Sequence, residues 1–147
     1  MLDNGQDTFL TSGWGGYLHL VQFTDLTPGE QIDSVAIKIA TPAGNIRYKV
    51  YQDNGFLDNP ATLLGETNSI PAQVGTVYNS LNNPVIIPAS GTVWVGFEVD
   101  SHAMQAYYSP DGVRKHIVHT FGDGPNPAGS VSTTTHPFWA GIEITGS

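Results

Sequence analysis

The 147-residue sequence predicts an all-β protein, an antiparallel β-sandwich of jelly-roll type, and three observations lead to that prediction. Apolar side chains alternate with period two along many short segments, as half-buried strands require. Turns rich in Gly, Pro and Asn separate these segments at intervals of about 8–15 residues, which is typical of sandwiches and jelly rolls. No window repeats apolar residues with helical spacing over three turns, so helices are not expected.

Five segments alternate most regularly and are the principal expected strands. They are residues 16–23, 32–40, 45–52, 92–99 and 138–145. In residues 45–52, for example, Ile46, Tyr48 and Val50 are expected to face inward, with Lys49 and Tyr51 facing outward. In each strand one of the two faces is more polar than the other. We therefore expect antiparallel sheets whose outer surfaces are solvated.

Weaker alternation predicts further strands at residues 63–66, 76–81, 85–87, 105–108 and 115–121. Pro84 and Pro88 bracket the third of these. Because proline cannot donate a hydrogen bond to a neighbouring strand, residues 85–87 are expected at a sheet edge.

The chain is expected to form a single domain over residues 1–147, because it contains no internal repeat and no linker-like stretch. Residues 1–12 are polar apart from Phe9 and Leu10 and suit an extended N-terminal arm.

Composition excludes several function classes. Thirteen Asp and Glu residues stand against five Lys and Arg residues, giving a net charge of -8, so no basic surface for nucleic acid can be assembled. No apolar run is long enough for insertion into a membrane. The absence of cysteine excludes disulfides and thiolate chemistry.

Two interpretations of the cellular location remain open. The first residues show neither the basic nor the apolar region of a signal peptide, which fits an intracellular protein. The low lysine content and the abundance of Thr, Gly and Asn favour the other interpretation. It places the chain outside the cell or on its surface, as a domain excised from a longer secreted chain.

Three stretches of the sequence, with four motifs between them, resemble a β-sandwich accessory module found in secreted bacterial and archaeal multidomain proteins. Residues 51–66 read YQDNGFLDNPATLLGE, residues 83–97 read NPVIIPASGTVWVGF, and residues 121–127 read FGDGPNP. They are similar to the module's Tyr-x-Asp-Asn-Gly, Leu-Leu-Gly-Glu, Gly-Thr-x-Trp-x-Gly-Phe and Asp-Gly-Pro patterns. The resemblance implies the sandwich fold and an accessory role beside surface proteins or polysaccharide-active enzymes, with ligands mostly unassigned.

The acidic loop at residues 53–59 is a candidate calcium site. Calcium prefers six to eight oxygen ligands, and this loop offers side-chain oxygens. The candidate ligands are Asp53, Asn54, Asp58 and Asn59. The alternative is a plain hairpin turn, in which Asn-Gly and Asp serve the backbone conformation.

Catalysis is not expected. His116 and His119 are three residues apart, which places them on opposite faces of a strand, and no His-x-His pair occurs. No serine lies in a nucleophile motif. Glu98 and Glu143 are conceivable as a glycosidase pair, although each also fits a solvated strand position.

Aromatic side chains give the stronger functional signal. Trp94 and Trp139 alternate out of phase with the core residues of their strands, as ligand-facing rings would. Sugars lay their C–H faces on exposed aromatic rings while short polar side chains bind the hydroxyls. The candidate ligand-binding residues are Trp14, Tyr17, Trp94, Tyr107, Tyr108 and Trp139. The alternative is that the tryptophans pack beneath a loop or over a sheet.

We therefore expect a non-catalytic binding module whose partner is a polysaccharide or other glycan. The alternative function is a structural subunit of a surface filament, sheath or virion. In that case self-association would insert Phe9 and Leu10 into a neighbouring subunit.

Overall fold

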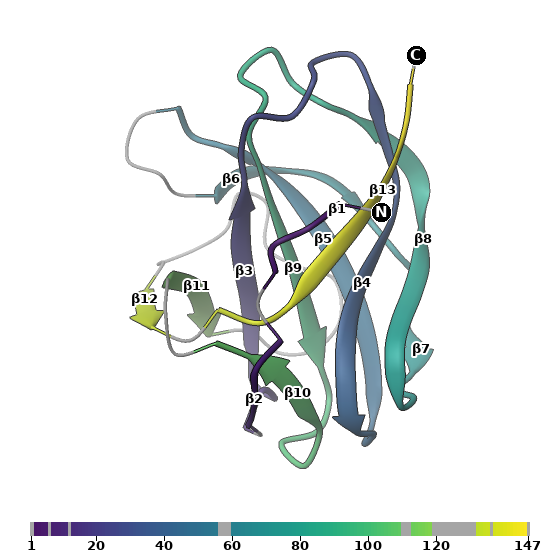
Figure 1. The fold of residues 1–147 in the computed structure, drawn as a ribbon, viewed down its shortest axis with the longest axis vertical. Coiled ribbons are helices and arrows are strands. Elements are labelled where there is room, and N and C mark those ends of the chain that lie inside the picture. Colours follow the sequence, from purple (N-terminus) through teal and green to yellow (C-terminus); the bar gives the residue numbers. More distant parts are fainter. Residues whose placement is uncertain are drawn as a thin grey trace.

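Two antiparallel sheets pack face to face, which confirms the predicted all-β sandwich (Figure 1). The computed structural model describes residues 2–5, 7–11, 13–55, 60–109, 113–118, 132–135 and 137–146. Among them there is no helix that could cross a membrane.

Within the described residues, sheet A has six strands. Their order is β1 (Leu2–Asp3), β13 (Ala140–Thr145), β4 (Gln31–Thr41), β10 (Gln105–Tyr108) and β2 (Phe9–Thr11), and β8 (Gly75–Ile86) also pairs with β4. Sheet B has seven strands in the part of the chain that the structure describes. Their order is β12 (Ser132–Thr135), β11 (Val113–Val118), β3 (Tyr17–Phe23), β9 (Val93–Val99), β5 (Asn45–Asp53) and β6 (Pro60–Glu66), and β7 (Ile70–Pro71) also pairs with β5.

The core lies between the sheets, where the inward faces of the predicted strands meet. Ile46, Tyr48 and Val50 of β5 are fully buried, as their alternation predicted. The Tyr48 hydroxyl donates a hydrogen bond of 2.5 Å to the backbone carbonyl of Val77 on β8. This bond satisfies the buried hydroxyl and joins one sheet to the other.

The outer face of sheet B is buried as well, so the expectation of a solvated surface is wrong there. Leu18, Leu20, Tyr51, Trp94 and Ile117 form a second apolar cluster, separate from the main core. Lys49 and Glu98 point the same way along their strands and are also buried. Period-two alternation identifies the two faces of a strand, but it does not show whether the more polar face is covered.

Strand β8 differs from the prediction because the expected segments 76–81 and 85–87 belong to one strand. Its pairing with β4 shifts register: Ser80 lies opposite Ser34, and Val85 lies opposite Ile32. The extra residues between Ser80 and Val85 form a bulge that contains Pro84, whose missing N–H a regular ladder would require. Among the described strands β8 pairs only with β4, which agrees with the predicted edge position.

Two short N-terminal strands lie along one edge of sheet A. β1 pairs with β13, and β2 pairs with β10. Between them, Asn4 forms three hydrogen bonds with residues 138–140, two of them through its side-chain amide. Of the residues expected to form an extended N-terminal arm, 2–3 and 9–11 are strands in a sheet of their own chain.

Four short strands were not predicted, namely β1, β2, β7 and β12. Each has only two to four residues, which is too short for alternation to be recognised. Residues 119–121 of the expected strand 115–121 lie outside the described residues.

Candidate functional site

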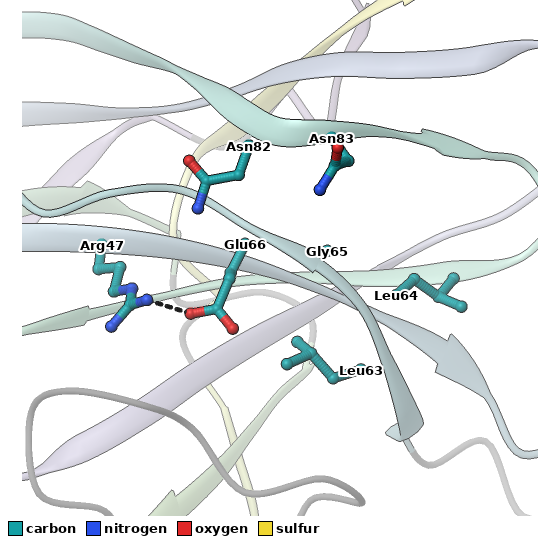
Figure 2. Close-up of a pocket in the computed structure, with 7 residues that line it drawn as sticks. All are labelled: Arg47, Leu63, Leu64, Gly65, Glu66, Asn82 and Asn83. Carbon is teal, nitrogen blue, oxygen red and sulfur yellow. Dashed lines mark ion pairs between the residues drawn. The ribbon is translucent and has the colours of Figure 1, made fainter.

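A hollow of about 430 Å³ opens where the edge of sheet B meets the edge of sheet A (Figure 2). Strand β6 forms one wall and the bulge of β8 forms the other. Small-molecule sites in proteins occupy about 300–1,000 Å³, so the volume suits a small ligand or one unit of a polymer. The lining residues are Arg47, Leu63, Leu64, Gly65, Glu66, Asn82 and Asn83.

The bulge supplies the exposed amides of Asn82 and Asn83. Both residues lie in the stretch of β8 that has no partners on β4, so their side chains are not confined to the regular alternation. Figure 2 shows both side chains across the hollow from Glu66. No hydrogen bond between described residues uses either amide, so both are available to a ligand.

Gly65 brings the two walls close together. A Cβ atom at this position would lie 2.6 Å from Cγ2 of Val85 on β8, which is closer than van der Waals contact allows. A larger residue would therefore push β6 away from the bulge.

The floor of the hollow is an ion pair between Arg47 and Glu66, which Figure 2 marks with a dashed line. The Nε atom of Arg47 also donates a 2.8 Å hydrogen bond to the backbone carbonyl of Thr67. These contacts fix the guanidinium plane on one side of the hollow, while Leu63 and Leu64 add apolar surface.

A second ion pair, between Lys49 and Glu98, lies next to the first on the outer face of sheet B. Nζ of Lys49 lies 3.8 Å from Oε1 of Glu98, and both side chains are buried. Across the strands, Lys49 is opposite Gly96 and Glu66, while Arg47 is opposite Glu98. Two cations therefore alternate with two carboxylates, so the charges of this quartet balance.

Tyr51 lies beside the quartet, and its hydroxyl stays protonated. Burial raises its pKa above the ordinary value, and the negative charges of Glu98 and Glu66 raise it further. The Tyr51 phenol is therefore neutral at every physiological pH.

The three predicted tryptophans are buried rather than ligand-facing. Trp14, Trp94 and Trp139 expose 1%, 4% and 5% of their surface. The Trp94 indole donates a 2.8 Å hydrogen bond to Asp53, and the Trp139 ring is covered by Lys38, whose Nζ lies 4.8 Å from the ring centroid. Trp14 packs within the main core. The expectation of exposed indole faces is wrong for all three, because each ring finds a partner inside the domain.

The predicted tyrosines are partly exposed but do not form one surface. Tyr107 lines a second hollow of about 330 Å³ on sheet A, together with Lys38 and Asp7. Tyr108 packs against Phe9 of β2, with ring centroids 6.0 Å apart. Tyr17 lies on β3 in the other sheet.

The candidate calcium loop is only partly described. Both carboxylate oxygens of Asp53 already accept hydrogen bonds, one from Trp94 and Gln22 and the other from the backbone of Gly55. Those contacts are typical of a turn that also anchors a side chain. Asp58 and Asn59 lie outside the described residues, and Asn54 is exposed.

The conceivable glycosidase pair does not come together. Glu98 is buried in sheet B, where the expected solvated position is wrong, whereas Glu143 is exposed on β13 of sheet A. Within the described part of the chain, no group of three His, Asp or Glu side chains could hold a metal ion.

The residues of the hollow were not predicted as a site. The available signal was the sequence Asn82-Asn83-Pro84 inside an otherwise alternating strand, which marks a bulge with two amides. No protein-family model, curated protein or solved structure matches this chain.

Proposed function

We propose that the protein is a non-catalytic, extracellular binding module whose ligand is a glycan. The observation that carries the proposal is the solvent-accessible hollow between β6 and β8, with two exposed amides facing an ion pair. The lysine-poor composition, rich in Thr, Gly and Asn, supports the extracellular setting.

The chemistry of the hollow suits sugar hydroxyls. A hydroxyl is both a donor and an acceptor, and an Asn side chain offers one carbonyl acceptor and two N–H donors on a plane. Glu66 adds acceptors and Arg47 adds donors. Leu63 and Leu64, which pack against different apolar clusters, each add apolar surface to the lining.

Affinity electrophoresis through a panel of soluble polysaccharides tests this proposal. We expect one polymer to retard the protein, and the double variant Asn82→Ala/Asn83→Ala to abolish the retardation. Both residues are exposed, so the variant should unfold at the wild-type temperature.

The matched control is Gln73→Ala, which removes an exposed amide outside the hollow and should leave the retardation unchanged. If the double variant and the wild type are retarded equally, the glycan binds at a site other than the hollow. Absence of retardation by every polymer would overturn the proposed ligand class.

One observation favours a second candidate function, a structural subunit of a surface assembly. Phe9 and Leu10 on β2 are 48% and 47% exposed, and β2 ends the strand order of sheet A. An apolar edge strand is a surface on which another chain can add.

A further inference from the structure

Arg114 on β11 is directed between the two sheets. Its NH1 atom lies 2.5 Å from Nδ1 of His19, and its guanidinium carbon lies 4.8 Å from the ring centroid of the buried Trp14. The adjacent Lys115 is directed the other way, where its Nζ donates a 2.8 Å hydrogen bond to Thr133. The alternation of side chains along β11 thus directs the Arg114 cation between the two sheets, near the edge of sheet B.

The contacts of His19 show which of its two ring nitrogens carries the proton. Because a guanidinium only donates, Nδ1 of His19 accepts from Arg114, and Nε2 carries the proton and donates to the Trp14 carbonyl at 2.8 Å. Burial and then the charge of Arg114 lower the pKa of His19 to about 3. His19 is therefore neutral and cannot share positive charge with Arg114.

His116 follows Arg114 by two residues on the same face of β11. Its ring lies edge-on to Tyr17, with centroids 5.4 Å apart. Burial and the charge of Arg114 lower its pKa. Two polar atoms in this pair, Nε of Arg114 and Nδ1 of His116, are buried and have no hydrogen-bond partner among the described residues.

The other described cations of the domain have different partners. Lys38, Arg47 and Lys49 each pair with a carboxylate, although acidic residues are in large excess over the whole chain. None of the contacts between Arg114 and the described residues involves a carboxylate. A half-buried cation with an unused donor is costly unless an anion compensates it.

We propose that Arg114 and His116 form a binding site for a carboxylate group of a ligand. The guanidinium fork matches the two oxygens of a carboxylate, and its Nε atom is the donor that lacks a partner within the described part of the chain. Protonated His116 would add a second donor. Tyr17, half-exposed beside His116, offers a ring face to the rest of the ligand.

This site is separate from the hollow described above. In the strand order of sheet B, β11 lies next to one end and β6 lies at the other. The proposal therefore goes beyond the proposed function and does not depend on it. Failure at Asn82 and Asn83 concerns one site, and failure at Arg114 concerns the other.

Titration with sodium glucuronate, followed by NMR of the histidine side chains, tests the proposal. Glucose is the neutral control and acetate is the minimal carboxylate. We expect glucuronate to shift the His116 resonances saturably and to raise the pKa of His116, while glucose has no effect. A shift with acetate as well would show that the carboxylate alone suffices.

The variant Arg114→Gln should lose about tenfold or more in glucuronate affinity, because charged hydrogen bonds contribute most of the binding. If Arg114→Gln does not fold, Arg114→Lys takes its place in the test. It keeps the positive charge but not the planar fork, so we expect a loss of glucuronate affinity that is smaller than tenfold. Lys115→Gln, on the opposite face of the same strand, should bind as the wild type does.

Binding should strengthen as pH falls through the pKa of His116. The titratable or charged described groups that contact His116 or act on its charge are Arg114 on its own strand and His19 and Tyr17 on β3, and none of them is a carboxylate. No saturable shift with glucuronate or acetate up to tens of millimolar would overturn the proposal, and so would equal shifts with glucose.

Discussion

At the scale of single residues, Asp53 connects a turn to the outer face of sheet B. One of its oxygens accepts hydrogen bonds from the Trp94 indole at 2.8 Å and from the Gln22 amide at 3.2 Å. The other accepts from the Gly55 backbone at 2.8 Å. The carboxylate thus satisfies a buried indole N–H that has no other partner among the described residues.

We expect Asp53→Ala to lower the free energy of unfolding by about 2 kcal/mol, because it leaves the Trp94 N–H without an acceptor. Urea unfolding measures the loss. Asp53→Asn keeps one acceptor oxygen and should lose less. If the loss disappears when calcium is chelated in both proteins, Asp53 serves a metal ion instead.

His19 should make stability depend on pH. Its pKa is lowered from 6.5 to about 3 in the folded protein, by burial first and by Arg114 second, so the unfolded chain binds a proton that the folded chain does not. Stability is therefore complete above about pH 6.5 and decreases as pH falls towards 3.

Between pH 7 and pH 5 the wild type should lose about 2 kcal/mol more than His19→Gln, since one unit of pKa corresponds to about 1.4 kcal/mol. Urea unfolding at the two pH values gives both differences. His102→Gln, at an exposed position, is the control and should keep the wild-type slope. Identical slopes for His19→Gln and the wild type would contradict the prediction.

Residue by residue, the sequence predicted inward positions better than outward ones. Val35, Ile37 and Ile39 are buried as expected, because apolar side chains fill most of the space between the two sheets. Lys49 and Glu98 were assigned to solvent because they alternate with the inward apolar residues of their strands. Their burial depends on a partner from another strand, and alternation within one strand carries no information about that partner.

At the scale of elements, the five principal predicted strands all occur, with boundaries within two residues of the prediction. Their alternation is long enough to be distinguished from chance. The hollow could not be predicted in the same way, because it arises where two sheet edges approach and where β8 loses its register beside Pro84. Register depends on pairing between distant segments rather than on local pattern.

The Asn4 side chain attaches the N-terminal segment to the chain near β13 through two hydrogen bonds. Its side-chain amide donates to the Phe138 carbonyl at 2.8 Å, and its carbonyl accepts from the Ala140 backbone at 3.1 Å. We expect Asn4→Ala to cost about 1–2 kcal/mol, seen as a fall of about 2–8 °C in Tm. Asn4→Asp retains the acceptor and should fall less. An unchanged Tm for Asn4→Ala would show that residues 2–5 contribute little to the folded state.

At the scale of the whole molecule, the two candidate functions differ in oligomeric state. The exposed large apolar side chains of the described residues are spread over several elements rather than gathered in one. They are Leu2, Phe9, Leu10, Val74, Tyr78 and Ile86. With a net charge of -8 opposing association, we expect a monomer.

Light scattering after size-exclusion chromatography tests this expectation. A monomer at all concentrations supports the binding module. Multimers would favour the structural subunit, and their loss on deletion of residues 1–12 would assign the contact to Phe9 and Leu10. Assembly that persists after the deletion would exclude insertion of that segment.

The pairing of β1 with β13 has a consequence for the order of the elements along the chain. Leu2 lies opposite Ile142 in antiparallel register, so the first and last strands already form the two arms of a hairpin that lacks its turn (Figure 1). A short turn joining them would close the backbone into a ring without moving either sheet. New ends could then be opened at Val74, which is 71% exposed between β7 and β8. A circular permutant of this kind would keep every pairing of the sandwich and begin beside the second hollow, near Tyr107.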